Sequence, residues 1–142
     1  MEQTKVFLVD DHQESRKVVR DFLNTYANVS VVGEAADGSE VMKKIHALLP
    51  DIVLMDIAMP QRNGIEVTRF IKQRFPAMKV IIVTMYDNPM YRIQAEEVKA
   101  DGFILKSSFK CGLELIFGPR SERTKSTLSL KKKDIYNTPV SA

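Results

Sequence analysis

The chain has 142 residues, a length typical of one globular domain that buries its core without disulfide bonds or structural metals. Its 44% hydrophobic and 27% charged residues exclude a disordered chain or a fibre, and its apolar runs are far shorter than the ~20 residues that span a bilayer. The net charge of +3 is concentrated in residues 119–142, where six Lys or Arg face two acids, so residues 1–118 are slightly acidic.

The single cysteine, Cys111, has no partner for an internal disulfide bond, and the N-terminus has no apolar core of a signal peptide. Both features favour a reducing, cytoplasmic setting. We expect residues 119–142 to be a basic, flexible tail or linker, because they are polar and lack a hydrophobic period. A basic tail of this kind is either a solvated extension or a segment that contacts nucleic acid.

Short apolar runs and amphipathic segments alternate five times along residues 1–118. The predicted strands are residues 6–9, 29–32, 52–55, 80–83 and 103–105. Three predicted helices carry apolar stripes over residues 18–26, 41–49 and 65–71. A fourth begins at the cap pair Asn88-Pro89, and a fifth covers about residues 108–117. This alternation predicts an α/β fold with five parallel strands and helices on both faces. Right-handed crossovers restrict the topology, and a five-stranded, flavodoxin-like version with the order 2-1-3-4-5 places its switch point between strands 1 and 3.

Polar residues end four of the predicted strands. Asp10 and Asp11 follow the first strand, Asp56 follows the third, Thr84 ends the fourth and Lys106 follows the fifth. In open parallel sheets, ligands bind beyond the carboxyl ends of the strands, near the point where the strand order reverses. We therefore expect these five side chains to converge on one edge of the sheet.

The chemistry of this set points to phosphoryl transfer. Clustered carboxylates repel one another and their pKa values should rise unless a cation joins them. Oxygen ligands of this type suit Mg²⁺. A metal ion, the Lys106 ammonium and the Thr84 hydroxyl would together orient and neutralise the oxygens of a phosphoryl group transferred to Asp56. His12 follows the aspartates, but its place at the start of a helix favours a structural role over metal ligation.

The sequence resembles a two-component response regulator receiver domain over about residues 1–117. The resemblance is carried by Asp10-Asp11-His12, by Met55-Asp56-Ile57-Ala58-Met59-Pro60 with Gly64, by Thr84-Met85-Tyr86-Asp87 and by Ala100-Asp101-Gly102-Phe103-Ile104-Leu105-Lys106. The motifs occur in the family's order on the expected elements, and their residues are most similar to those of receivers of the NarL/FixJ group.

The resemblance implies that Asp56 accepts a phosphoryl group from a sensor histidine kinase or phosphotransfer protein. It implies a Mg²⁺ site formed by Asp10, Asp11, Asp56 and the backbone carbonyl of Ala58, and no other cofactor. In the family, the residues matching Thr84 and Lys106 contact the phosphoryl group. The only reactions implied are self-phosphorylation and autodephosphorylation, without turnover of a separate substrate.

The resemblance also implies a conformational switch. Thr84 and Phe103 match the family's switch threonine and aromatic residue, and the surface of the fourth helix, fifth strand and fifth helix changes for downstream protein partners or for a second copy of the chain. Met85 departs from the family's usual small residue and could restrict access to Asp56. Ser107 replaces a common proline, which leaves the isomer of the preceding peptide bond open.

The output is less defined, because NarL/FixJ regulators usually carry a helix-turn-helix domain and only about 24 residues follow the receiver here. We expect residues 1–118 to form the receiver, with its DNA-binding output domain missing and with no direct nucleic-acid or membrane binding of its own. An alternative is a phosphorylation-independent interaction module with the receiver fold. A phosphatase on a similar sheet is disfavoured, because no second acid follows Asp56 at a suitable spacing.

Overall fold

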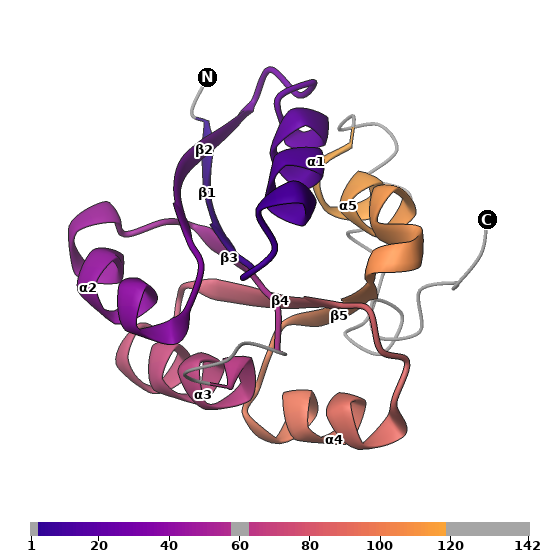
Figure 1. The fold of residues 1–142 in the computed structure, drawn as a ribbon. Coiled ribbons are helices and arrows are strands. Elements are labelled where there is room, and N and C mark those ends of the chain that lie inside the picture. Colours follow the sequence, from indigo (N-terminus) through magenta and orange to yellow (C-terminus); the bar gives the residue numbers. More distant parts are fainter. Residues whose placement is uncertain (1–2, 58–62, 119–142) are drawn as a thin grey trace.

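A computed structural model of the chain describes residues 3–57 and 63–118. It contains one parallel sheet with the strand order β2-β1-β3-β4-β5, which confirms the predicted topology (Figure 1). The strands are β1 (Thr4–Val9), β2 (Val29–Ala35), β3 (Ile52–Met55), β4 (Lys79–Thr84) and β5 (Gly102–Leu105). Each β3 residue is buried, as expected for a central strand covered on both faces.

Helices cover both faces of the sheet. In Figure 1, α1 (Gln13–Leu23) and α5 (Phe109–Phe117) lie on one side, and α2 (Gly38–Leu48), α3 (Gly64–Arg74) and α4 (Pro89–Glu97) lie on the other. A short 3₁₀ turn, Lys106–Ser108, precedes α5. Among the helices of the described ranges, none combines the length and the apolar character that a bilayer span requires.

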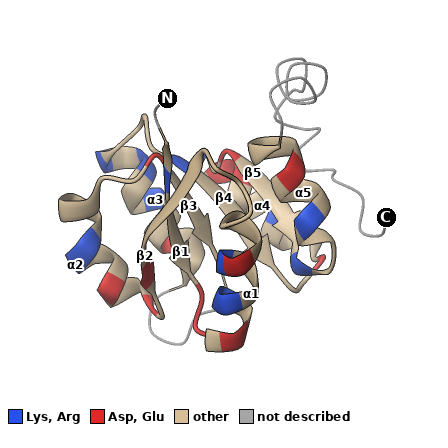
Figure 2. Ribbon diagram, turned by 90° about the horizontal axis from the view of Figure 1, so that it is seen from above, with Lys and Arg blue, Asp and Glu red and all other residues tan. Residues whose placement is uncertain are grey.

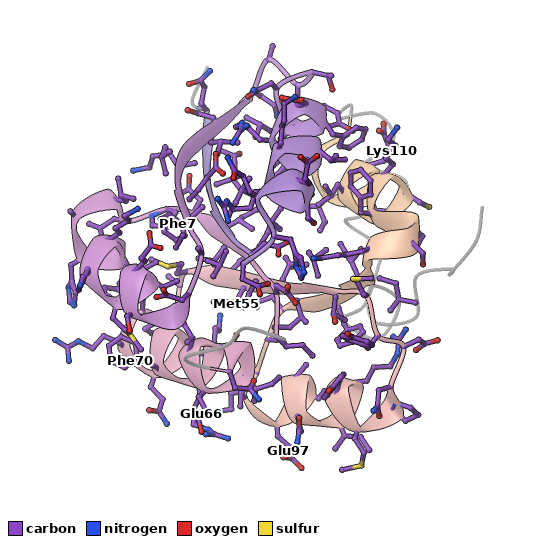
Figure 3. The ribbon with its side chains drawn as sticks, viewed as in Figure 1. Phe7, Met55, Glu66, Phe70, Glu97 and Lys110 are labelled. Carbon is purple, nitrogen blue, oxygen red and sulfur yellow. The ribbon has the colours of Figure 1, made fainter. Side chains whose placement is uncertain are left out.

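The two faces of the sheet bury separate hydrophobic clusters. Phe7, Val53 and Met55 pack with α2, α3 and α4, whereas Leu8 and Leu54 pack with α1 and α5. Alternate residues of one strand thus enter opposite clusters, which is the two-residue period of a β-strand. Figure 3 shows Phe7 and Met55 in the interior, while Glu66, Glu97 and Lys110 lie on outer helix surfaces.

Side-chain caps set the start of three helices. Asp37, Asn63 and Asn88 precede α2, α3 and α4, and each side chain accepts a hydrogen bond from a main-chain N–H in the first helical turn. The cap and first-turn proline predicted at Asn88-Pro89 are confirmed. The largest differences from the predicted boundaries are that β2 continues to Ala35 and that α1 ends at Leu23. The apolar stripe of α1 nevertheless extends to Tyr26, because this side chain also packs against the core.

The register of the two central strands determines where the acidic residues lie. Val9 of β1 pairs with Met55 of β3, so Asp10 and Asp56 follow neighbouring positions. The Asp56 N–H donates to the Val9 carbonyl at 2.9 Å, and the Asp10 N–H donates to the Ala35 carbonyl at 3.0 Å. Main-chain hydrogen bonds therefore hold both acids at the carboxyl edge of the sheet.

Gly64, the first residue of α3, packs against the main chain that carries Asp56. A Cβ at this position would lie 2.4 Å from the Asp56 carbonyl oxygen and 2.7 Å from Ile57 Cα, and neither backbone atom has room to move away. We expect Gly64→Ala to lower the free energy of unfolding by about 1–3 kcal/mol, despite the better helix propensity of alanine. Urea unfolding followed by circular dichroism measures this loss.

Gly33→Ala is the matched control. There the nearest atoms belong to side chains and not to the backbone: the end of the flexible Leu48 side chain at 2.7 Å, which can rotate away, and the Phe7 ring at 3.0 Å. Gly33→Ala should therefore cost less, and equal losses in the two variants would contradict the backbone clash at Gly64.

Candidate functional site

The described part of the predicted site gathers at the carboxyl edge of the sheet. Asp10 and Asp56 are 7% and 4% exposed, and Lys106 reaches both of them from the end of β5. Lys106 Nζ lies 2.7 Å from Asp10 Oδ2 and 3.4 Å from Asp56 Oδ2. The structure thus places Asp10, Asp56 and Lys106 together, although 96 residues separate Asp10 from Lys106.

A four-residue group at this edge has the composition of a metal site. One ligand atom each from Asp10, Asp11, His12 and Asp56 lies within 4.8 Å of the others. Asp11 Oδ1 is buried and accepts no hydrogen bond from the described residues; its near neighbour is His12 Nδ1 at 3.1 Å, itself one of the four candidate ligand atoms. A set of three carboxylates fits a hard cation such as Mg²⁺. Ala58, whose carbonyl was predicted to complete this set, lies outside the described residues.

His12 was predicted to have a structural role at the start of a helix. In the structure it lies at the start of α1, and its ring is also close to two carboxylates. It occupies the N-cap position of α1, but its side chain makes no cap hydrogen bond. Its Nδ1 lies 3.1 Å from Asp11 Oδ1 and 3.4 Å from Asp10 Oδ1, and the ring is 61% exposed. The sequence placed His12 beside the aspartates, but only the turn before α1 brings its ring back over them.

Asp10 illustrates how the site balances its charge. Burial raises the pKa of Asp10, but hydrogen bonds from Lys106, the His12 N–H and Ser15, with the charge of Lys106, outweigh it and hold this pKa below its ordinary value. A rise was predicted only if no cation joined the carboxylates, and for Asp10 the Lys106 ammonium is such a cation, so its pKa is lowered instead. The charged form of Asp10 stabilises the fold above its unfolded-state pKa, and this contribution is lost as the pH falls through the folded-state pKa.

Thr84 and Phe103, the predicted switch residues, lie on neighbouring strands and are both buried. The Thr84 hydroxyl accepts a hydrogen bond from the Tyr86 N–H at 3.3 Å. Phe103 is 1% exposed, and the guanidinium carbon of Arg92 lies 4.6 Å from the centre of its ring. Arg92, on α4, also pairs with Asp87 at 3.1 Å. This cation–π contact was not predicted, because Arg92 and Phe103 lie on separate elements and no sequence pattern connects them.

The structure describes both positions, Met85 and Ser107, at which the sequence departs from the family's usual residues. Met85 is 65% exposed and is not among the residues that line the pocket at Asp10 and Asp56. The described chain has no cis peptide bond, so the bond between Lys106 and Ser107 is trans. The pocket is otherwise lined by apolar side chains, by Lys106 and by Arg16, a residue that the strand-end pattern did not single out.

Comparison with known proteins identifies the family. The sequence profile described as "Response regulator receiver domain" matches residues 6–114. The chain belongs to this family. The receiver is 39% identical over 106 residues to the response regulator protein VraR of Staphylococcus saprophyticus, with 73% of this chain and 50% of that protein covered. It therefore spans about half the length of the curated relatives it matches.

Solved structures agree with this assignment. The signal receiver domain of a NarL response regulator from Mycobacterium tuberculosis is 33% identical, with a TM-score of 0.72 over 90% of this chain and 95% of that one. A LuxR-family response regulator from Aurantimonas is 31% identical, with a TM-score of 0.77 over 96% and 95% of the two chains. The predicted similarity to the NarL/FixJ group is thus confirmed.

Replacing Lys106 by methionine tests the charge balance. In Lys106→Met, burial and the neighbouring carboxylates act on Asp10 without the opposing ammonium, so the pKa of Asp10 should rise above its wild-type value. Carboxyl ¹³C NMR titration measures it directly. Lys17→Met is the control, because Lys17 pairs with Asp21 on the exposed surface of α1. An unchanged Asp10 pKa in Lys106→Met would show that Lys106 does not set it.

Proposed function

We propose that this receiver is a phosphorylation-controlled switch in which Asp56 accepts a phosphoryl group from a sensor histidine kinase or phosphotransfer protein. The observation that carries the proposal is the convergence of Lys106 and of the carboxylates of Asp10 and Asp11 on Asp56. An Asp56 oxygen would form the new P–O bond while the P–N bond of a phosphohistidine breaks and its electron pair returns to the imidazole. Turnover of a separate substrate is not part of this function.

Each neighbour of Asp56 has a proposed role in the transfer. Asp10, Asp11 and Asp56, with the carbonyl of Ala58, would hold Mg²⁺, which supplies neutralising charge to the phosphoryl oxygens. Lys106 is already 3.4 Å from Asp56 Oδ2 and would contact one phosphoryl oxygen. The Thr84 hydroxyl accepts a hydrogen bond from the Tyr86 N–H, which leaves its own O–H to donate to another phosphoryl oxygen.

The signal would leave through the α4–β5–α5 surface. Thr84 ends β4 and Phe103 lies on β5, so a shift of Thr84 and Phe103 would move the start of α4. We assign the receiver to residues 1–118, with 119–142 as a basic tail outside the described residues. The output, whether a protein partner or a DNA-binding domain of a longer protein, would read the altered surface.

Beryllofluoride, a phosphoryl mimic, tests the phosphoacceptor role. The receiver domain of RcsB from Salmonella enterica, 26% identical to this chain, has been solved in the presence of this mimic. With Mg²⁺ and beryllofluoride, we expect amide NMR shifts at Asp10, Asp56, Thr84 and Lys106, followed by shifts along α4. Asp56→Asn should abolish them, because the mimic needs the carboxylate oxygen.

Asp51→Asn is the matched control for this experiment. Asp51 lies just before the first residue of β3, at the opposite end of the strand from Asp56, and its Oδ2 accepts a hydrogen bond from the Lys5 N–H at 2.8 Å. This variant should bind the mimic as the wild type does. Shifts that persist in Asp56→Asn would contradict the phosphoacceptor assignment.

One observation favours a second candidate function, a phosphorylation-independent interaction module. Four apolar side chains at and before α4 are about half or more exposed, namely Met85, Tyr86, Met90 and Ile93. Such a patch is typical of a protein-binding surface. If the wild type binds Mg²⁺ but the mimic changes no α4 amide, this second function takes precedence over the switch.

A further inference from the structure

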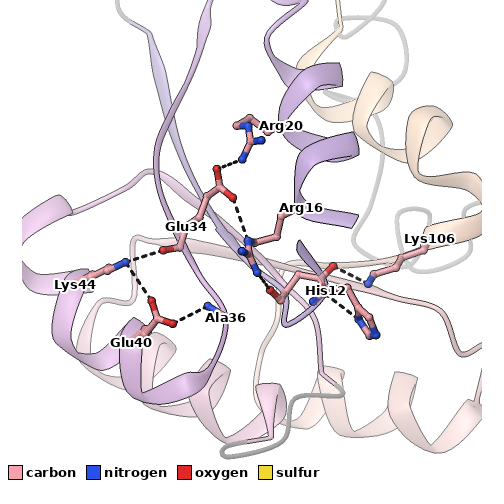
Figure 4. Close-up of polar contacts among 9 residues, drawn as sticks. His12, Arg16, Arg20, Glu34, Ala36, Glu40, Lys44 and Lys106 are labelled. Carbon is pink, nitrogen blue, oxygen red and sulfur yellow. Dashed lines mark hydrogen bonds and ion pairs between the residues drawn. The ribbon is translucent and has the colours of Figure 1, made fainter. Parts of the chain in front are cut away.

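Arg16 connects three elements beside the acidic site. It lies in the first turns of α1, and its side chain is 17% exposed. Its Nε donates to Glu34 Oε1 on β2 at 3.1 Å, and its Nη1 donates to the main-chain carbonyl of Asp10 (Figure 4). One guanidinium therefore ties the turn between β1 and α1 to strand β2.

The contact with the Asp10 carbonyl completes a set of restraints on this residue. The Asp10 N–H is held by Ala35, and its two carboxylate oxygens accept hydrogen bonds from the His12 N–H and from Lys106. The carbonyl, held by Arg16, belongs to the peptide unit that leads to Asp11. Fixing this peptide fixes the direction in which the chain presents the Asp11 carboxylate.

Glu34 sets the orientation of Arg16. Its carboxylate accepts from both Arg16 and Arg20, and its main-chain carbonyl accepts from Lys44 on α2 at 2.9 Å. Charged residues of both signs lie along α1 and α2 in Figure 2. Because a guanidinium is a planar fork, holding its Nε on Glu34 directs its Nη1 toward the Asp10 carbonyl.

We propose that Arg16, oriented by Glu34, is a positioning residue for the metal site, which keeps the Asp10 and Asp11 carboxylates turned toward Asp56. This inference rests on the proposed function, because it concerns the same Mg²⁺ site. Arg16 acts through the main chain of Asp10, in the way that outer contacts orient metal ligands in other proteins.

Two effects of Arg16 on metal affinity have opposite signs, which makes the inference testable. As a positive charge near the carboxylates, Arg16 repels Mg²⁺, so its removal by electrostatics alone would tighten binding. As a positioning residue it aligns the ligands, so its removal would weaken binding. The direction of the change therefore distinguishes the two effects.

The experiment compares Arg16→Gln with Arg20→Gln in the full chain. Both variants remove one positive charge from Glu34, but only Arg16 contacts Asp10. We expect Arg16→Gln to raise the Mg²⁺ dissociation constant about tenfold, measured by amide NMR titration without a phosphodonor. Exchange of the Asp11 amide hydrogen should also become faster. Arg20→Gln should leave Mg²⁺ affinity unchanged or slightly tighter.

A variant that keeps the charge covers the case in which Arg16→Gln does not fold. Arg16→Lys retains the ammonium charge but lacks the fork that reaches Glu34 and Asp10 together, so it too should weaken Mg²⁺ binding. Wild-type or tighter affinity in Arg16→Gln or Arg16→Lys would overturn the positioning role and leave the phosphoacceptor role intact. A wild-type chain that does not bind Mg²⁺ would overturn both.

Discussion

Electrostatic repulsion among carboxylates is the constraint on which this structure depends. Parallel pairing of β1 with β3 brings Asp10 and Asp56 to neighbouring positions, where two buried negative charges are costly. Lys106 offsets this cost by contacting both of them from β5. The carboxyl ends of β1, β3 and β5 must therefore lie at the same edge of the sheet. The strand order brings these ends together, and the helices that pack on both faces hold the strands in place.

The two ends of the sheet use acids in different ways. Before β3 and β5, Asp51 and Asp101 accept hydrogen bonds from the Lys5 and Val80 N–H groups, and Asp101 also pairs with Lys72. These carboxylates fasten the main chain. At the carboxyl end, Asp11 keeps a buried oxygen that accepts no hydrogen bond from the described residues, so the acids of that edge retain capacity for a ligand.

The sequence predicted what depends on local patterns and chain order. Apolar runs located all five strands, and the alternation with helices predicted a parallel sheet whose known five-stranded version has the observed order. It missed three side-chain contacts: Arg16 with the Asp10 carbonyl, the His12 ring with Asp11, and Arg92 with the Phe103 ring. The first and the third join residues that are not neighbours in the sequence, and the second depends on how the turn before α1 folds. A helical arginine has the same sequence signature whether it faces solvent or a carbonyl oxygen, because periodicity specifies the face of a helix but not the atom across from it.

The contact of Arg92 with Phe103 has a mechanical consequence for α4. The ring lies in the core on β5, and the arginine that covers it belongs to α4 and pairs with Asp87 in the preceding loop. Outward rotation of Phe103 would displace Arg92 and strain its pairing with Asp87. The inward ring and the start of α4 are thus joined through one side chain, Arg92, which links a residue that solvent does not reach to the helix that carries the exposed Met90 and Ile93.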